Sequence, residues 1–257
     1  MDTQLQKRYK ILLIGDSCKD IYHFGTIDRI SPEAPVPILR TQKTEERPGM
    51  AFNVKKNLES FNIEVDFFTN KESIKKHRFI DIKTKSQLLR VDEGEQDLLP
   101  PFAPTVQNSD YDAVVISDYD KGFLTANVCE KITRQFKSLP VFVDSKKKDL
   151  SCFYESFIKI NEQEYTNSKK ICPTSRVIVT LGDKGALYKG KIFPTKKIEV
   201  HDVCGAGDVF LSSLAYAFLE TRQIERAITY ANKLATLSVT RFGTHVLTRN
   251  EINEICI

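Results

Sequence analysis

The chain has 257 residues, of which 41% are hydrophobic and 28% are charged, and its formal net charge is +4. This length suits one large α/β domain with a real core, and the scattered, mildly positive charge argues against a nucleic-acid partner. The six cysteines lack C-x-x-C spacing and the four histidines lie far apart, so neither a zinc site nor a disulfide framework is indicated. We see no signal peptide and no membrane-length apolar run, and therefore expect a reduced, soluble, cytoplasmic protein.

Short apolar runs alternate with helical patterns along the chain. The sequence predicts buried strands over 11–14, 65–69, 113–116, 141–143, 157–158 and 177–179. It predicts helices over 51–61, 125–139 and 224–239, the last from an apolar repeat of 3.6 residues. This alternation indicates an α/β fold: a three-layer α/β/α sandwich with a mainly parallel central sheet. In such sheets ligands bind at the carboxyl ends of the strands.

Two segments do not follow the alternation. Residues 22–48 show no helical period and contain several prolines, and residues 79–91 alternate like exposed strands. We expect a single domain over 1–257, in which segments of roughly 21–48 and 79–92 form a small β lid over the site.

The strongest chemical signal is a glycine-rich turn over 201–208, followed by an apolar helical run. The amides of Gly205, Ala206 and Gly207 would bind an anion at the start of that helix. Asp208, ionised in the positive end of the helix dipole, would take a proton from a substrate hydroxyl. The alternative is a tight turn in which Asp208 is only a capping residue.

Polar residues also follow other predicted strands. Asp16 and Asp20 come after the first strand, where they would bind sugar hydroxyls or serve as turn and cap residues. Asn161 and Glu164 come after the strand at 157–160. They would hold metal-bound water near phosphates, since Mg²⁺ usually keeps several waters, or would simply cap a helix. The next strand ends in Thr180-Leu181-Gly182-Asp183-Lys184-Gly185, whose glycines would admit a nucleotide or form an ordinary hairpin turn.

In this order, the motifs resemble those of the ribokinase-like (PfkB) carbohydrate kinases over nearly the whole chain. Residues 202–208 are similar to the signature shared across that family. The stretches 29–37, 46–49 with Asn53, 88–92 and 117–122 resemble its heptose-7-phosphate kinases in particular.

The resemblance implies ATP-dependent phosphorylation of a sugar hydroxyl, with Asp208 as general base, the amides of 205–207 as anion hole, and ATP and Mg²⁺ as cofactors. Asn161 and Glu164 would lie in the metal and phosphate region. The residues implied for the nucleotide are Thr180, Gly182, Gly185, Asn232 and Gly243. Those implied for the sugar or sugar phosphate are Asp16, Asp20, Gly49, Asn53 and Lys121. By analogy, a homodimer through the β lid is implied as well.

The chain departs from the pattern of these kinases at Met50 and Phe52, which replace small residues beside the implied sugar site. Met50 is strained if its position needs φ > 0, and we expect only one of the two side chains to narrow the sugar site. Connections after Asn70 and after Glu164 are short. A kinase for a heptose phosphate or another sugar therefore stands beside a second interpretation: a catalytically weak homologue that binds sugar phosphate, nucleotide or another subunit.

Overall fold

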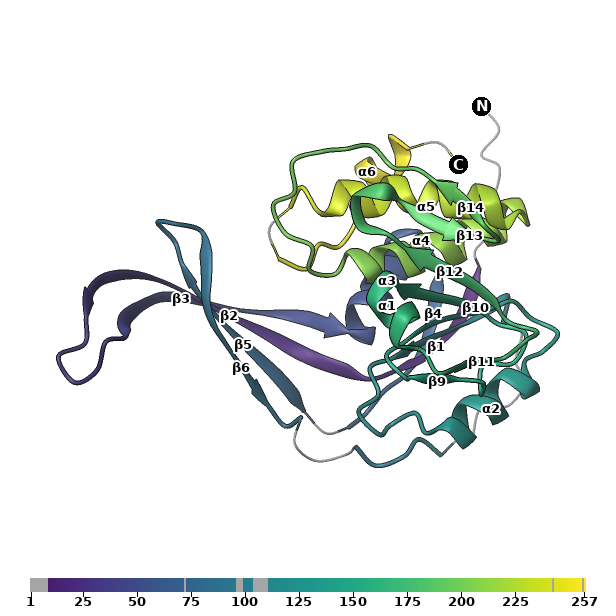
Figure 1. Ribbon diagram of the computed structural model, residues 1–257, viewed down its shortest axis with the longest axis horizontal. Helices are drawn as coiled ribbons and strands as arrows, with labels where there is room; N and C mark the ends of the chain where they lie inside the picture. The colour runs from purple at the N-terminus through teal and green to yellow at the C-terminus, as the bar shows by residue number, and fades with distance from the viewer. Residues whose placement is uncertain (1–8, 72, 96–98, 104–110, 242, 256) are drawn as a thin grey trace.

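The computed structural model describes residues 9–71, 73–95, 99–103, 111–241, 243–255 and 257. Its large sheet consists, in spatial order, of β14 (Lys191–Phe193), β13 (Ala186–Tyr188), β12 (Arg176–Thr180), β10 (Phe157–Asn161), β8 (Val141–Ser145), β7 (Ala113–Asp118), β1 (Lys10–Gly15) and β4 (Glu64–Phe68). The six strands from β12 to β4 are parallel, and β13 and β14 are antiparallel additions at one edge. Each predicted strand is confirmed within two or three residues (Figure 1).

Helices cover both faces of this sheet, which confirms the three-layer α/β fold. In β1, Ile11 and Leu13 pack into one core and Leu12 and Ile14 into the other, because successive side chains point to opposite faces. The first core also contains residues of α1 (Ala51–Ser60), α4 (Ala206–Thr221) and α5 (Ile224–Ser238). The second contains those of α2 (Ala126–Gln135), which ends four residues before its predicted end.

The remaining elements of the body are short. They are α3 (Glu162–Asn167), the 3-10 helix η1 (Gly182–Lys184), α6 (Arg249–Asn253), and the strand pair β9 (Asp149–Leu150) and β11 (Lys170–Ile171). Among the described residues, no helix combines the length and hydropathy that crossing a bilayer requires.

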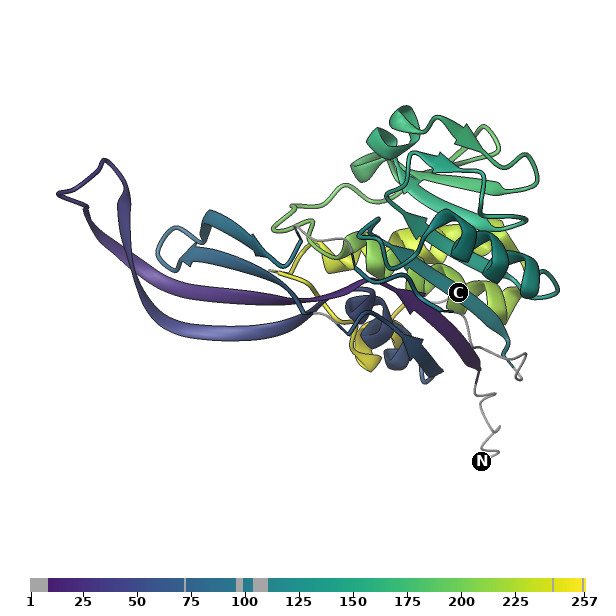
Figure 2. The ribbon, with the colours of Figure 1, turned by 90° about the horizontal axis from the view of Figure 1, so that it is seen from below.

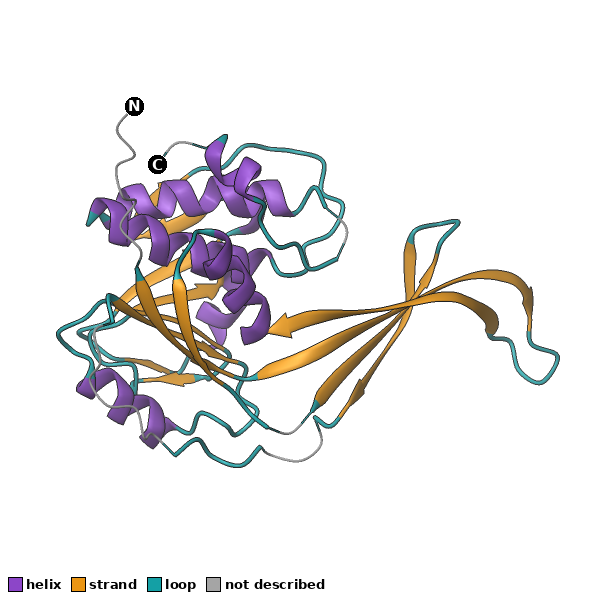
Figure 3. Cartoon of the chain, turned by 180° about the vertical axis from the view of Figure 1, so that it is seen from behind, coloured by secondary structure: helices purple, strands orange, loops and turns teal. Residues whose placement is uncertain are grey.

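A second sheet of four strands extends away from the body as a long twisted ribbon (Figures 2 and 3). Its order is β3 (Pro37–Met50), β2 (Ser17–Ile30), β5 (Ile74–Asp81) and β6 (Ser86–Glu93). β2 begins before the predicted lid segment 21–48, and β3 ends two residues after it. β5 begins before the predicted segment 79–92, and β6 ends one residue after it. Because only Asp16 separates β1 from β2, this small sheet starts at the carboxyl edge of the large one.

The connection from β4 to β5 is short, as the sequence indicates, and its described residues form neither helix nor strand. Asn70 ties it to the base of β2: its Oδ1 accepts a hydrogen bond from the Ser17 amide at 2.7 Å, and its Nδ2 donates to the Ser17 carbonyl at 3.2 Å. The small sheet is thus anchored at the end of the large sheet where ligands bind in such folds.

Candidate active site

The glycine-rich turn before α4 brings the backbone close to two other elements. Gly205 caps α4 with φ of 80°, a conformation that favours glycine. A Cβ at Gly205 would lie 2.9 Å from Nδ2 of Asn53 on α1, and a Cβ at Gly207 would lie 2.7 Å from Nζ of Lys159 on β10. Because these positions are glycine, the start of α4 can lie close to the side-chain amide of Asn53 and the ammonium group of Lys159.

The amides at the start of α4 are only partly free. The Ala206 amide donates to the Val203 carbonyl at 3.3 Å, and the Asp208 amide donates to the Gly205 carbonyl at 3.0 Å. Within the described part of the chain, the Gly207 amide has no hydrogen-bond acceptor. Of the amides that the sequence indicates as an anion hole, that of Gly207 is thus free and that of Ala206 is already engaged.

Asp208 is buried, and both of its carboxylate oxygens accept hydrogen bonds. Nδ2 of Asn53 donates to Oδ2 at 2.9 Å, and the Tyr119 hydroxyl donates to Oδ1 at 3.2 Å. Burial raises the pKa of Asp208 to about 6 and outweighs the opposing effect of the Asn53 hydrogen bond. The group is therefore still largely ionised at pH 7, and its proton affinity is close to what a general base needs there.

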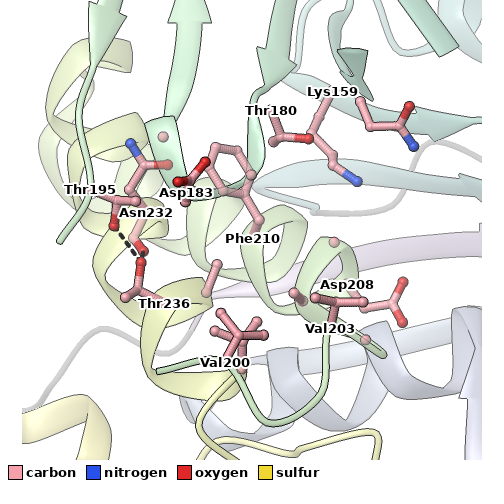
Figure 4. Close-up of a pocket in the computed structure, with 18 of the residues that line it drawn as sticks. Lys159, Thr180, Asp183, Thr195, Val200, Val203, Asp208, Phe210, Asn232 and Thr236 are labelled. Carbon is pink, nitrogen blue, oxygen red and sulfur yellow. Dashed lines mark hydrogen bonds between the residues drawn. The ribbon is translucent and has the colours of Figure 1, made fainter. Parts of the chain in front are cut away.

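A cavity of about 460 Å³ opens beside Asp208. Asn232 and Thr236 lie at one end of it, and Lys159 and Asp208 lie at the other (Figure 4). The sequence-predicted residues that line it are Asn161, Thr180, Gly182, Gly185, Gly205, Ala206, Gly207, Asp208 and Asn232. The structure thus gathers the residues implied for catalysis with most of those implied for the nucleotide.

Two lysines of this cavity were missed by the sequence analysis. Nζ of Lys159 lies 2.6 Å from Oδ2 of Asp144, which belongs to the neighbouring strand β8. Lys146 pairs with Glu164 and lies 3.5 Å from Oδ1 of Asp144. Although burial opposes its ionisation, the two ammonium groups hold the pKa of Asp144 below its usual range. The available signal was the lysine in the otherwise apolar strand at 157–160.

Asn161 and Glu164 form the capping box of α3. The Glu164 amide donates to Oδ1 of Asn161 at 2.8 Å, and the Asn161 amide donates to Oε2 of Glu164 at 2.9 Å. Asn161 lines the cavity, whereas Glu164 does not. In the described chain, no cluster of three or more His, Cys, Asp and Glu side chains is arranged to bind a metal directly. The oxygens of Asn161, Glu164 and Asp144 nevertheless fit a Mg²⁺ ion that is bound by substrate phosphates and keeps its waters.

The acidic residues implied for the sugar lie outside this cavity, toward the small sheet. Asp16 is fully buried: its Oδ2 accepts the Tyr119 amide at 2.6 Å, and its Oδ1 has no partner among the described residues. Burial, and then the nearby Asp118, raise the pKa of Asp16 to about 6. Asp20 forms an ion pair with Arg78 of β5 at 3.0 Å.

Gly49, Lys121 and Gly243 also lie outside the cavity lining. A Cβ at Gly49 would lie 2.4 Å from Oδ2 of Asp20, so glycine leaves room for that carboxylate. Lys121 forms an ion pair with Glu95 at 2.8 Å. Gly243 has φ of 76°, and a Cβ there would lie 2.4 Å from Nη1 of Arg47. The structure thus places Gly243 beside Arg47 of β3 and outside the cavity lined by Asn232, with which the sequence analysis grouped it.

Met50 and Phe52 do not line the cavity either. Met50, immediately before α1, has φ of 55° and ψ of −134°. Its side chain is buried in the second core. The Phe52 ring packs edge-on against Phe67 of β4, with 5.7 Å between centroids. The strain expected at Met50 is therefore present in its backbone.

The chain is similar to known proteins in sequence. A model of the pfkB family carbohydrate kinases matches residues 156–250. The chain is 33% identical over 303 residues to the bifunctional protein HldE of Nitratiruptor sp., in an alignment covering 95% of this chain and 64% of that protein. It is 31% identical over 305 residues to HldE of Campylobacter jejuni, covering 97% and 65%. The chain thus spans slightly less than two thirds of the length of these relatives.

Solved structures share the fold at low sequence identity. Phosphofructokinase-2 from Escherichia coli, in complex with substrates and products, superposes with a TM-score of 0.73 at 15% identity and covers 97% of this chain and 98% of its own. Ribokinase from Thermotoga maritima gives 0.68 at 18% identity, covering 96% and 98%.

Proposed function

We propose that this chain, which belongs to the PfkB family of carbohydrate kinases, transfers the γ-phosphoryl group of ATP to a hydroxyl of a sugar phosphate similar to heptose 7-phosphate. The observation that carries the proposal is the arrangement at the start of α4. There a buried carboxylate with a pKa of about 6 lies beside a free amide and an ammonium group, at one end of a cavity. Phosphoryl transfer needs positioning and charge stabilisation more than covalent chemistry.

In this proposal the nucleotide occupies the cavity with its base toward Asn232 and Thr236 and its phosphates toward Lys159. Thr180, Gly182 and Gly185 line the path between the two ends. The Gly207 amide and the Lys159 ammonium stabilise the charge on the transferring phosphoryl group.

Asp208 then takes the proton of the sugar hydroxyl as the hydroxyl oxygen bonds to the γ-phosphorus, and the bond from that phosphorus to the β,γ-bridging oxygen breaks to release ADP. Bound Mg²⁺ supplies charge neutralisation on the phosphates. Asn161 and Glu164 are the residues of this chain that would hold its waters.

The sugar would lie on the other side of Asp208, between the large sheet and the small sheet, near Asp16, Asp20, Gly49, Asn53 and Lys121. On the face of the small sheet that Asp20 shares, an anionic substrate would compete for cations that now pair with Glu95, Asp20 and Asp92. The strand register places Lys76, Arg78 and Arg90 on that face, since directly paired residues point to the same side.

The experiment that tests the function is a screen of ATP consumption across sugars and sugar phosphates, each with and without Mg²⁺. We expect Mg²⁺-dependent ADP release that requires a sugar phosphate, and heptose 7-phosphate to be among the best acceptors. Tight binding of nucleotide or sugar phosphate without turnover would instead favour a catalytically weak binding protein. Turnover of unphosphorylated sugars alone would contradict the proposed substrate class.

We also propose a homodimer through the small sheet. Among the described strands, β3 and β6 each pair on one side only, and an unpaired edge favours association. Leu89 and Val91 of β6 are 56% and 44% exposed, and Ile30 at the end of β2 is 59% exposed. Sedimentation equilibrium tests this: we expect a dimer that Leu89→Lys weakens, and a monomeric parent would refute it.

A further inference from the structure

We infer that Tyr119 is a positioning residue for this reaction: its hydroxyl fixes the orientation of the Asp208 carboxylate and stabilises its charge. The inference rests on the proposed function, because it assigns a role in the use of the proposed base. Tyr119 follows β7, whereas Asp208 belongs to α4, 89 residues further along the chain. No local sequence signal connects them.

The two carboxylate oxygens of Asp208 are held from two sides. Asn53 on α1 donates to Oδ2 and Tyr119 donates to Oδ1, at 2.9 and 3.2 Å. Rotation of the carboxylate would break both bonds at once. Of the two donors, only Tyr119 lines the cavity, whereas Asn53 is fully buried. Tyr119 therefore holds the oxygen of Asp208 on the cavity side.

The backbone that carries Tyr119 is itself fixed. Its amide donates to Oδ2 of Asp16 at 2.6 Å. The preceding Asp118 accepts the Ser145 hydroxyl at 2.6 Å and lies 3.3 Å from Nζ of Lys147. The ends of β1, β7 and β8 thus determine where the Tyr119 hydroxyl lies, as a positioning residue requires.

The Tyr119 ring also connects the two halves of the site. Its centroid lies 5.7 Å from Nζ of Lys146, which lines the cavity, and 5.9 Å from Nζ of Lys76, which belongs to the small sheet. A change in this side chain would therefore be felt by both the nucleotide side and the sugar side.

The charge of Asp208 depends on a small set of neighbours. Asp144 on β8 opposes its ionisation. Lys159 on β10 and Lys146 after β8 favour it, as do the hydrogen bonds from Asn53 and Tyr119. Burial, and then the Asp208 charge, raise the pKa of the Tyr119 hydroxyl well above its usual value, so this group stays a donor at every working pH.

The test compares Tyr119→Phe with Tyr111→Phe. The control also loses a phenol that donates to a carboxylate, since the Tyr111 hydroxyl donates to Oδ2 of Asp66 at 2.7 Å. Tyr111 precedes β7, at the opposite end of the strand from the site. Both changes leave the ring in place, and thermal unfolding shows whether each variant is folded.

We expect Tyr119→Phe to lower kcat about three- to tenfold at pH 7 with little change in the KM for ATP. The acid limb of its kcat–pH profile should move up by about half to one pH unit, the worth of one hydrogen bond to a carboxylate. With a parent pKa of about 6, this shift lowers the ionised fraction of Asp208 at pH 7 by less than about twofold, so most of the loss comes from the orientation of the carboxylate and should persist above pH 8. Tyr111→Phe should reproduce the parent profile. A Tyr119→Phe profile that superposes on the parent profile overturns the inference.

A second measurement does not depend on activity. The Asp208 carboxyl can be titrated by NMR in protein labelled with ¹³C-aspartate, with Asp208→Asn identifying its signal. We expect the Asp208 titration to move to higher pH in Tyr119→Phe, and an unmoved titration overturns the inference. If the parent phosphorylates no sugar but the titration still moves, the proposed function has failed while the contact stands. If Tyr119→Phe does not fold, 3-fluorotyrosine labelling of the parent gives a stronger donor, and Asp208 should then titrate at lower pH.

Discussion

Lys159 of β10 and Asp144 of β8 form a buried ion pair that faces the start of α4. The register of the two parallel strands places them opposite each other, and their side chains are only 4% and 6% exposed. A Cβ at Gly207 would lie 2.7 Å from Nζ of the same Lys159. One ammonium group therefore compensates a buried carboxylate and also faces the helix start where phosphates would bind.

Lys159→Met should destabilise the protein by about 3 kcal/mol, because it leaves the Asp144 charge buried with only Lys146 nearby. The double variant Lys159→Met/Asp144→Asn should recover much of that stability in urea unfolding but not the turnover. Recovery of parental kcat in the double variant would show that Lys159 serves stability alone.

Met50 gives a test of backbone strain. At its φ of 55° and ψ of −134°, glycine is favoured over any residue with a Cβ. Met50→Gly should therefore be more stable than Met50→Ala by about 1 kcal/mol in urea unfolding. At the exposed helical position Lys131 of α2, by contrast, Lys131→Ala should be more stable than Lys131→Gly, since alanine is the better helix former there. Equal stability of the two Met50 variants would mean that the strain is relieved locally.

Asp16 should make stability depend on pH. Because burial raises its folded-state pKa from 3.8 to about 6, its favourable contribution is complete below about pH 4 and is lost as the pH rises through 6. As the pH rises from 4.5 to 7.5, the free energy of unfolding of Asp16→Asn should therefore increase by up to about 2 kcal/mol relative to that of the parent. The pKa of Asp149 is instead lowered by hydrogen bonds from Ser151, so Asp149→Asn should not show this gain. A difference in unfolding free energy between Asp16→Asn and the parent that does not change with pH would contradict the raised pKa of Asp16.

Glu164→Gln should raise the Mg²⁺ concentration needed for half-maximal activity several-fold, while the KM for the sugar changes little. The amide oxygen of glutamine still accepts the Asn161 amide, so the cap of α3 should persist. Glu162→Gln, which removes a neighbouring charge from the same helical turn, is the matched control. If the Mg²⁺ dependence is unchanged while the KM for the sugar rises, Glu164 acts on the sugar side of the site and not on the metal side.

Features of the fold that depend on neighbouring residues could be predicted from the sequence. The apolar run at 11–14 identified a strand buried on both faces, and the apolar repeat from Ile224 identified α5 to within a residue. The strain at Met50 was predicted because Met50 replaces a small residue in the kinase motif that this part of the chain resembles. In each case a few adjacent residues carry the signal.

Contacts between distant segments could not be predicted in this way. Asn53 and Asp208 are 155 residues apart, and their contact depends on how α1 packs against α4. The pairing of Lys159 with Asp144 depends on the register of two strands. Gly243 lies against the side chain of Arg47 on β3, which its own neighbours in sequence do not indicate.

The role of Asp208 is tested most directly by following transfer of labelled γ-phosphate from ATP to the preferred sugar in Asp208→Asn and in the parent. Asparagine keeps the shape of the side chain but cannot accept the proton, so turnover should fall by about two to four orders of magnitude. Nucleotide binding and thermal unfolding should remain close to those of the parent. A folded Asp208→Asn variant with near-parental turnover would contradict the assignment of Asp208 as the base.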